Sequence, residues 1–174
     1  MLHEDMLLTK AKILKELKST VFIDLNYLKI HNWVAFPFDS GLHFSEEEIH
    51  QLVHFANQNN FDHYNAFAIE GLEPEMEFLK IKSDLLSLKD YNQNFGSFNY
   101  IFFPPYASFL VICRSSDDFN IFIGKESTSD EIFHLNTVKA KSNFERFIQE
   151  VSTIQDFKIY LTRIYDYYFP STPN

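Results

Sequence analysis

Along the chain, the spacing of apolar positions alternates between strand-like and helix-like patterns. Two segments predict β-structure most clearly. Residues 109–113 and 119–123 are almost wholly apolar, and a polar run at 114–118 separates them. Two apolar runs joined by a short polar turn predict an antiparallel hairpin, which we place at the centre of a sheet. Pro37 should end one of the other strands. Shorter β-type runs predict these strands at residues 21–25, 33–36, 64–69 and 75–82.

Helical spacing occurs near both ends of the chain and once between them. Residues 4–18 repeat leucines at helical intervals, and two further apolar stripes cover 144–151 and 157–168. The segment from Ser45 to Glu48 matches a capping box, in which the serine hydroxyl accepts from the Glu48 N–H and the glutamate reaches back. This motif predicts a helix that starts there and ends at residues 57–60.

These elements predict a single α+β domain over residues 1–174. Its sheet should be mainly antiparallel with a central hairpin, flanked by N- and C-terminal helices. The chain length suits one domain, and no repeat or long linker divides it. With Phe 20, Tyr 9 and Trp 1 among 174 residues, aromatic rings must fill much of the interior. The hairpin residues expected in the core are Phe109, Val111, Phe119, Ile121 and Phe122.

Negative charge is concentrated in the middle of the chain. The formal net charge is −9, and residues 39–90 hold 11 acidic but only 3 basic side chains. Such a segment would repel a nucleic-acid backbone and attract a basic protein partner. It could equally serve to solvate an aromatic-rich protein. The acids that we expect to face outward toward a partner are Glu73, Glu75, Glu77, Asp117 and Asp118.

One group of side chains has the spacing of metal ligands. Glu47, His50 and His54 lie on one side of the predicted helix, so two imidazoles and a carboxylate could bind a metal ion. The zincin pattern, however, needs Glu directly after the first His, and Gln51 stands there. The three side chains also lie opposite the apolar stripe of that helix. We therefore favour a solvated face and expect neither a metal nor a cofactor.

The single cysteine, Cys113, is the second candidate for catalytic chemistry, as a nucleophile. Cys113 could act with His134 as base and Asp117 or Asp118 as orienting acid. The four residues before Cys113 are apolar and supply no cation to lower its pKa, so we expect a buried, inert thiol and no enzyme. A single cysteine, an acidic N-terminus without an export signal and no apolar run of about 20 residues favour a soluble cytoplasmic protein off the membrane.

The C-terminal half resembles a known class of proteins. An apolar strand, a Ser/Asp turn and an aromatic strand ending in Gly occupy residues 108–124, before a helix with Phe144-Glu145-Arg146-Phe147 and a tyrosine-rich last helix. This pattern resembles small immunity proteins, the bacterial partners of polymorphic toxins delivered by contact-dependent or type VI systems. The resemblance implies a cytoplasmic antitoxin that occludes one cognate toxin without catalytic residues. The alternatives are a metal-dependent enzyme using the Glu47/His50/His54 face and an adaptor domain.

Overall fold

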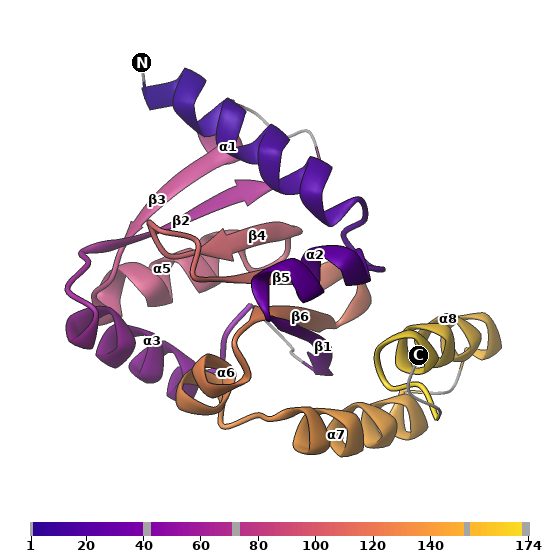
Figure 1. Cartoon of the computed structure of the whole chain (residues 1–174). Coiled ribbons are helices and arrows are strands. Elements are labelled where there is room, and N and C mark those ends of the chain that lie inside the picture. The colour runs from indigo at the N-terminus through magenta and orange to yellow at the C-terminus, as the bar shows by residue number, and fades with distance from the viewer. Residues whose placement is uncertain (1, 40–42, 71–73, 152–153, 172–174) are drawn as a thin grey trace.

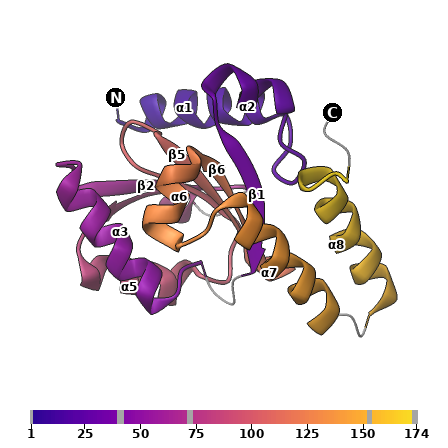
Figure 2. The same ribbon diagram turned by 60° about the horizontal axis from the view of Figure 1, so that its bottom comes forward.

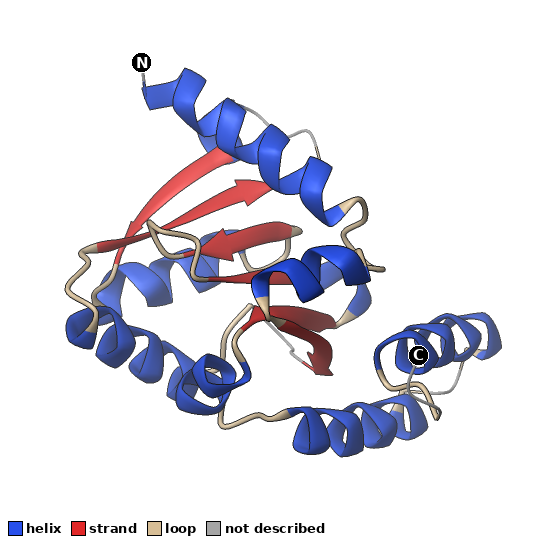
Figure 3. Ribbon diagram, in the orientation of Figure 1, coloured by secondary structure: helices blue, strands red, loops and turns tan. Residues whose placement is uncertain are grey.

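The computed structural model describes residues 2–39, 43–70, 74–151 and 154–171, which form one six-stranded antiparallel sheet with flanking helices (Figures 1 and 3). The predicted α+β class is confirmed. The spatial order of the strands is β1-β6-β5-β4-β2-β3, and every neighbouring pair is antiparallel. The strands are β1 (Val34–Asp39), β2 (His63–Ala68), β3 (Phe78–Lys82), β4 (Tyr100–Phe103), β5 (Phe109–Arg114) and β6 (Phe119–Gly124).

Helices cover both faces of the sheet (Figure 2). On one face lie α1 (Leu2–Leu17) and α2 (Leu25–His31), and on the other lie α3 (Glu46–Gln58), α5 (Leu85–Phe95) and α6 (Glu126–Phe133). The last two helices, α7 (Thr137–Glu150) and α8 (Gln155–Tyr168), pack beside β1, and a short α4 (Pro74–Glu77) precedes β3. Within the described ranges, no helix is both long enough and apolar enough to cross a membrane.

The predicted hairpin forms and is buried on both faces. Counting from the β1 edge, β6 is the second strand and β5 the third, so each has a neighbour on both sides. The ring of Phe122 packs against Phe133 of α6, whereas Phe119, on the opposite face of β6, packs against Phe144 of α7 at 5.7 Å between centroids. This double burial explains why both strands are continuously apolar in sequence. The predicted core residues Phe109, Val111, Phe119, Ile121 and Phe122 are all fully buried.

The capping box also forms as predicted. The backbone N–H of Ser45 donates to Glu48 Oε2 at 2.6 Å, and the backbone N–H of Glu48 donates to Ser45 Oγ at 3.3 Å. The helix α3 that follows ends at Gln58. The closing helices α7 and α8 confirm the two C-terminal stripes, and α1 confirms the opening one.

Two strand predictions near the N-terminus need correction. Residues 21–25 form no strand, because the Asp24 side chain accepts from the Asn26 N–H and starts helix α2 at Leu25. Pro37 does not end its strand but lies inside β1, opposite Ile121. β1 is an edge strand, where a residue without an N–H can face away from the sheet.

The middle of the chain holds a third correction and several elements that the sequence did not predict. Residues 75–82 are not one strand: α4 ends at Glu77, and β3 occupies only Phe78–Lys82. Helices α5 and α6 and strand β4 were not predicted. The Asp84 side chain caps α5 by accepting from the Ser87 N–H at 2.8 Å. Helices α5 and α6 lie beside α3 and supply much of the layer that covers this face of the sheet.

Candidate partner-binding surface

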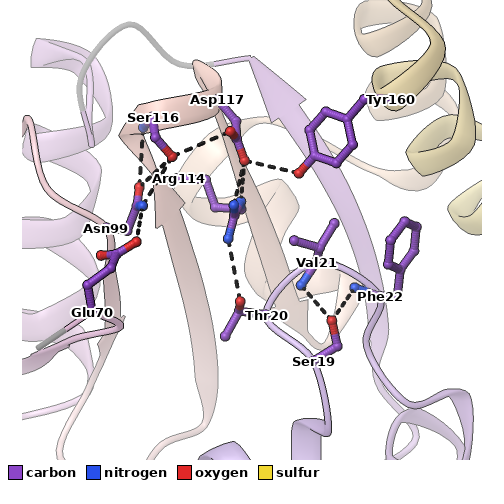
Figure 4. Close-up of polar contacts among 10 residues, drawn as sticks. All are labelled: Ser19, Thr20, Val21, Phe22, Glu70, Asn99, Arg114, Ser116, Asp117 and Tyr160. Atoms are coloured by element: carbon purple, nitrogen blue, oxygen red, sulfur yellow. Dashed lines mark hydrogen bonds and ion pairs between the residues drawn. The ribbon is translucent and has the colours of Figure 1, made fainter. Parts of the chain in front are cut away.

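Asp117, which we expected to face outward, points into the protein instead. Its Oδ2 accepts from Arg114 Nε at 2.6 Å and lies 2.6 Å from Arg114 Nη2 (Figure 4). The Tyr160 hydroxyl of α8 donates to the same oxygen at 3.0 Å. Only 18% of the Asp117 side chain is exposed. This carboxylate is therefore used inside the fold, and its outward presentation was wrongly predicted.

The same turn ties together segments that are far apart in sequence. Arg114 Nη1 also donates to Thr20 Oγ1, in the connector after α1, at 3.4 Å (Figure 4). On the other side of the turn, Asn99 Oδ1 accepts from the Ser116 N–H at 3.2 Å. Burial raises the pKa of Tyr160 to about 12, with a further contribution from the Asp117 charge. The polar groups of this junction thus fix the positions of the connector, the hairpin turn and α8 relative to one another.

The other predicted acids fall into two groups. Glu77 Oε1 pairs with Lys10 Nζ at 2.9 Å, and the same ammonium lies 5.6 Å from the centre of the Phe78 ring. Since 27% of the Glu77 side chain is exposed, it mainly anchors α1 to the sheet rather than facing outward as predicted. Glu73 and the side chain of Glu75 lie outside the described residues, so their predicted role stays a prediction.

Asp118 is exposed, and the fold places other acids at the same end of the sheet. Asp118 has a left-handed backbone (φ 56°) in the hairpin turn, and Asp39 pairs opposite Phe119, the next residue. Asp39 in turn lies close enough to Glu48 to affect its titration. We call the exposed acids Asp39, Glu47 and Asp118, with the half-buried Glu48, the acidic rim.

The electrostatics of the acidic rim follow from its packing. Burial raises the pKa of Glu48, its bonds with Ser45 oppose that shift, and the charges of Asp39 and Glu47 add to it. A raised pKa caused partly by neighbouring acids is a sign of concentrated negative charge. The sequence prediction missed Asp39, because its proximity to the hairpin arises only from the pairing of β1 with β6. The acidic rim therefore brings together carboxylates from three separate backbone segments.

The histidine face of α3 is exposed, as the solvated-face reading predicts. Glu47, His50 and His54 all lie on the outside of the helix, and Glu47 Oε1 is 3.7 Å from His134 Nε2. Over the residues that the structure describes, no group of three or more His, Cys, Asp or Glu side chains is arranged to hold a metal ion.

The groups with the largest pKa shifts lie in the interior. Cys113 is fully buried, and burial raises its pKa well above the usual thiol value, as expected of an inert thiol. His43 donates from Nε2 to the Phe98 carbonyl at 2.7 Å, and burial lowers its pKa to about 4. Burial also raises the pKa of Tyr91. The imidazole of His134, by contrast, is exposed beside Glu47, whereas the Cys113 thiol is enclosed in the core.

Comparisons with protein families, with characterised proteins and with solved structures find no match to this chain. The resemblance of residues 108–124 to immunity proteins stays a prediction from the sequence pattern.

Proposed function

We propose that this chain is a binding protein of the immunity type, which neutralises one cognate toxin by occluding a basic site on it. The contact would be made by the acidic rim. The observation that carries the proposal is that Asp39, Glu47 and Asp118 come from β1, α3 and the hairpin turn, yet share one end of the fold and stay exposed.

The contrast with the other acids supports this choice of surface. Asp117 and Glu77 each have a basic partner within the chain, Arg114 and Lys10, so part of their charge is already compensated. In the acidic rim, Glu47 faces an imidazole, His134 Nε2 at 3.7 Å, which is a cation only when protonated. A carboxylate without a permanent internal cation projects more of its field outward and steers a basic partner during encounter. The resemblance to immunity proteins points in the same direction, and the buried state of Cys113 suits a reducing cytoplasm.

The proposal predicts that a gene beside this one encodes a toxin domain, and the binding test uses that domain as the partner; a neighbourhood without such a gene would count against the immunity function. The variant Asp39→Asn, Glu47→Gln, Asp118→Asn removes three charges and keeps side-chain size. Asparagine also tolerates the left-handed backbone at position 118. We expect association to slow by about tenfold and its salt dependence to weaken, because rim charges act mainly on the encounter rate. Protection of cells that express the toxin should fall in parallel.

A matched control removes the same charge elsewhere. Glu145→Gln, Glu150→Gln and Asp166→Asn change three exposed acids on α7 and α8. The control should bind and protect like the unchanged protein. Equal association rates for both triple variants would refute the acidic rim as the contact surface, and failure of the unchanged chain to bind or protect would refute the immunity function.

A further inference from the structure

Strand β3 forms one edge of the sheet. In the described part of the chain it pairs with β2 alone, and it is the last strand in the spatial order. Along such an edge, every second residue turns its backbone N–H and C=O away from the sheet. These groups can pair with an added strand from another chain. The five residues of β3 offer an edge about 17 Å long.

A groove runs along this edge between β3 and α5. It has a volume of about 770 Å³ and is lined by all five residues of β3. Its other wall is α5, where Leu86 is 80% exposed and the residues Tyr91 and Phe95 also line the groove. The size lies within the usual range of binding clefts. The groove thus joins an open backbone edge to apolar contact surface.

The charge of the groove is opposite to that of the surrounding sequence. Residues 39–90 contain three basic side chains, Lys80, Lys82 and Lys89, and all three line this groove. Asp90 is the single acid among the residues that line it. Lys89 Nζ is paired with Glu46 at 2.5 Å. Lys80 and Lys82 are exposed on β3 itself, near enough to Asp62 and Asp84 to contribute to lowering the pKa of those two carboxyl groups. Two exposed cations along an open strand edge favour an anionic occupant.

Strand geometry specifies the pattern of that occupant. Lys80 and Lys82 are two residues apart, so they project together from the face of β3 opposite α5 and meet the groove along the strand edge. Leu79 and Ile81 project toward the α5 side, since Ile81 pairs with Tyr64, which bonds to α3 on that face. A strand added beside β3 would place alternate side chains on these two faces in turn. Acids at every second position would meet the lysines, and apolar side chains between them would contact Leu86.

We propose that the groove between β3 and α5 binds an extended acidic segment of a partner protein, which adds to the sheet beside β3. The segment alternates acidic and apolar residues. This second interaction surface does not depend on the immunity function, because it uses other residues and selects the opposite charge. The competing explanation is that the edge lysines only prevent sheet-to-sheet aggregation.

The binding test uses capped, fluorescent octapeptides that alternate Glu and Val, with a shuffled peptide of equal composition as reference. We expect the alternating peptide to bind at least tenfold more tightly than the shuffled one and to slow amide exchange in β3. Lys80→Glu with Lys82→Glu should weaken binding by tenfold or more. Lys12→Glu with Lys15→Glu, which changes two exposed lysines of α1, should leave it unchanged.

Strand addition has a signature that simple charge attraction lacks. Methylating the backbone nitrogens of the Glu residues in one peptide, and of the Val residues in another, blocks opposite edges of the added strand. We expect one of these peptides to lose binding and the other to keep it. Equal binding by both, no binding of the alternating peptide, or equal binding to both lysine variants would overturn the proposal. A dimer of this chain that Lys80→Glu with Lys82→Glu abolishes would also overturn it, because the occupant would then be a second copy.

Discussion

Tyr160, in the first half of the last helix, donates a hydrogen bond to Asp117 in the turn of the central hairpin, with 3.0 Å between the two oxygens. The two residues are 43 positions apart in the sequence. The same carboxylate oxygen is held by Arg114 at 2.6 Å, so α8 is attached to the sheet through an ion pair already fixed by the hairpin. This contact converts a turn that looks solvated in the sequence into a structural junction.

Replacing Tyr160 with Phe should lower the free energy of unfolding by about 1 kcal/mol, since one partly buried hydrogen bond to a charged acceptor is lost. Asp117→Asn should cost more, because Arg114 would keep its charge in a site where only 14% of its side chain is exposed. Urea denaturation of both variants checks the order. Tyr106→Phe, at an 88% exposed position, is the control and should have no effect. Equal stability of Tyr160→Phe and the unchanged protein would show that the contact contributes nothing.

Phe119→Ala should destabilise the protein by about 3 to 5 kcal/mol, because the ring is fully buried against Phe144 and its removal leaves a cavity. Thermal and urea denaturation measure the loss. Val138→Ala, on the exposed side of α7, should change stability little. A folded Phe119→Ala protein of normal stability would contradict the burial of both hairpin faces.

Gly124→Ala should cost about 1 to 3 kcal/mol through overpacking. A Cβ atom at position 124 would lie 2.8 Å from Phe109 Cβ and 2.8 Å from Phe122 Cζ, and the first of these atoms is fixed close to the backbone of the paired strand. The midpoint of thermal unfolding should therefore fall. Ser108→Ala, exposed and next to the same strand, serves as the control. An unchanged midpoint would mean that β5 and the Phe122 ring shift to accommodate the added methyl group at little cost in folding free energy.

His43 should make stability depend on pH between about 6.5 and 4. Burial lowers its pKa to about 4 in the folded protein, so in this window the unfolded chain binds a proton that the folded chain does not. Stability should rise with pH through the window, and about 3 kcal/mol should be lost by pH 4. Glu48 acts in the opposite sense, because its pKa is raised in the fold.

The variant His43→Gln isolates this effect, since an amide can still donate to the Phe98 carbonyl but does not titrate. Its stability should be lower at neutral pH and should vary less between pH 6.5 and 4 than that of the unchanged protein. Parallel pH profiles for the two proteins would refute the role of His43.

His50→Ala with His54→Ala should leave the thermal midpoint unchanged, with or without a chelator, because both imidazoles are exposed on α3. Metal analysis of the purified protein is an independent measurement and should detect no stoichiometric metal ion. A drop of several degrees on adding chelator to the unchanged protein would instead support a metal role for the Glu47/His50/His54 face.

The sequence was most informative where a pattern is local. The capping box at Ser45 and Glu48 depends on atoms three residues apart, and the hairpin depends on two neighbouring apolar runs with a short polar turn. Both therefore form as predicted. The amphipathic stripes of the closing helices are likewise a property of short windows, so α7 and α8 were predicted as well.

The two N-terminal errors have different causes: a local helix cap that the prediction missed, and a strand position that the sheet topology sets. Residues 21–25 have strand-forming side chains, but Asp24 caps a helix, and the Tyr168 hydroxyl of α8 donates to the Val21 carbonyl. Pro37 is compatible with a strand only because the topology leaves β1 at the edge of the sheet. The Asp24 cap is a local signal that the sequence prediction missed, because it joins atoms only two residues apart. The edge position of β1, by contrast, cannot be derived from the neighbours of Pro37 in the chain.

The sequence by itself determined the fold class, the central hairpin and the concentration of acids between residues 39 and 90. Only the tertiary structure decided which acids face outward. Asp117 and Asp118 are adjacent in the chain, yet Arg114 and Tyr160 bind the first, while the second is exposed in a left-handed turn position. Asp39 joins Asp118 at the acidic rim because β1 pairs with β6. Charge can be counted along a sequence, but its compensation depends on which cations the folded chain brings within a few ångströms.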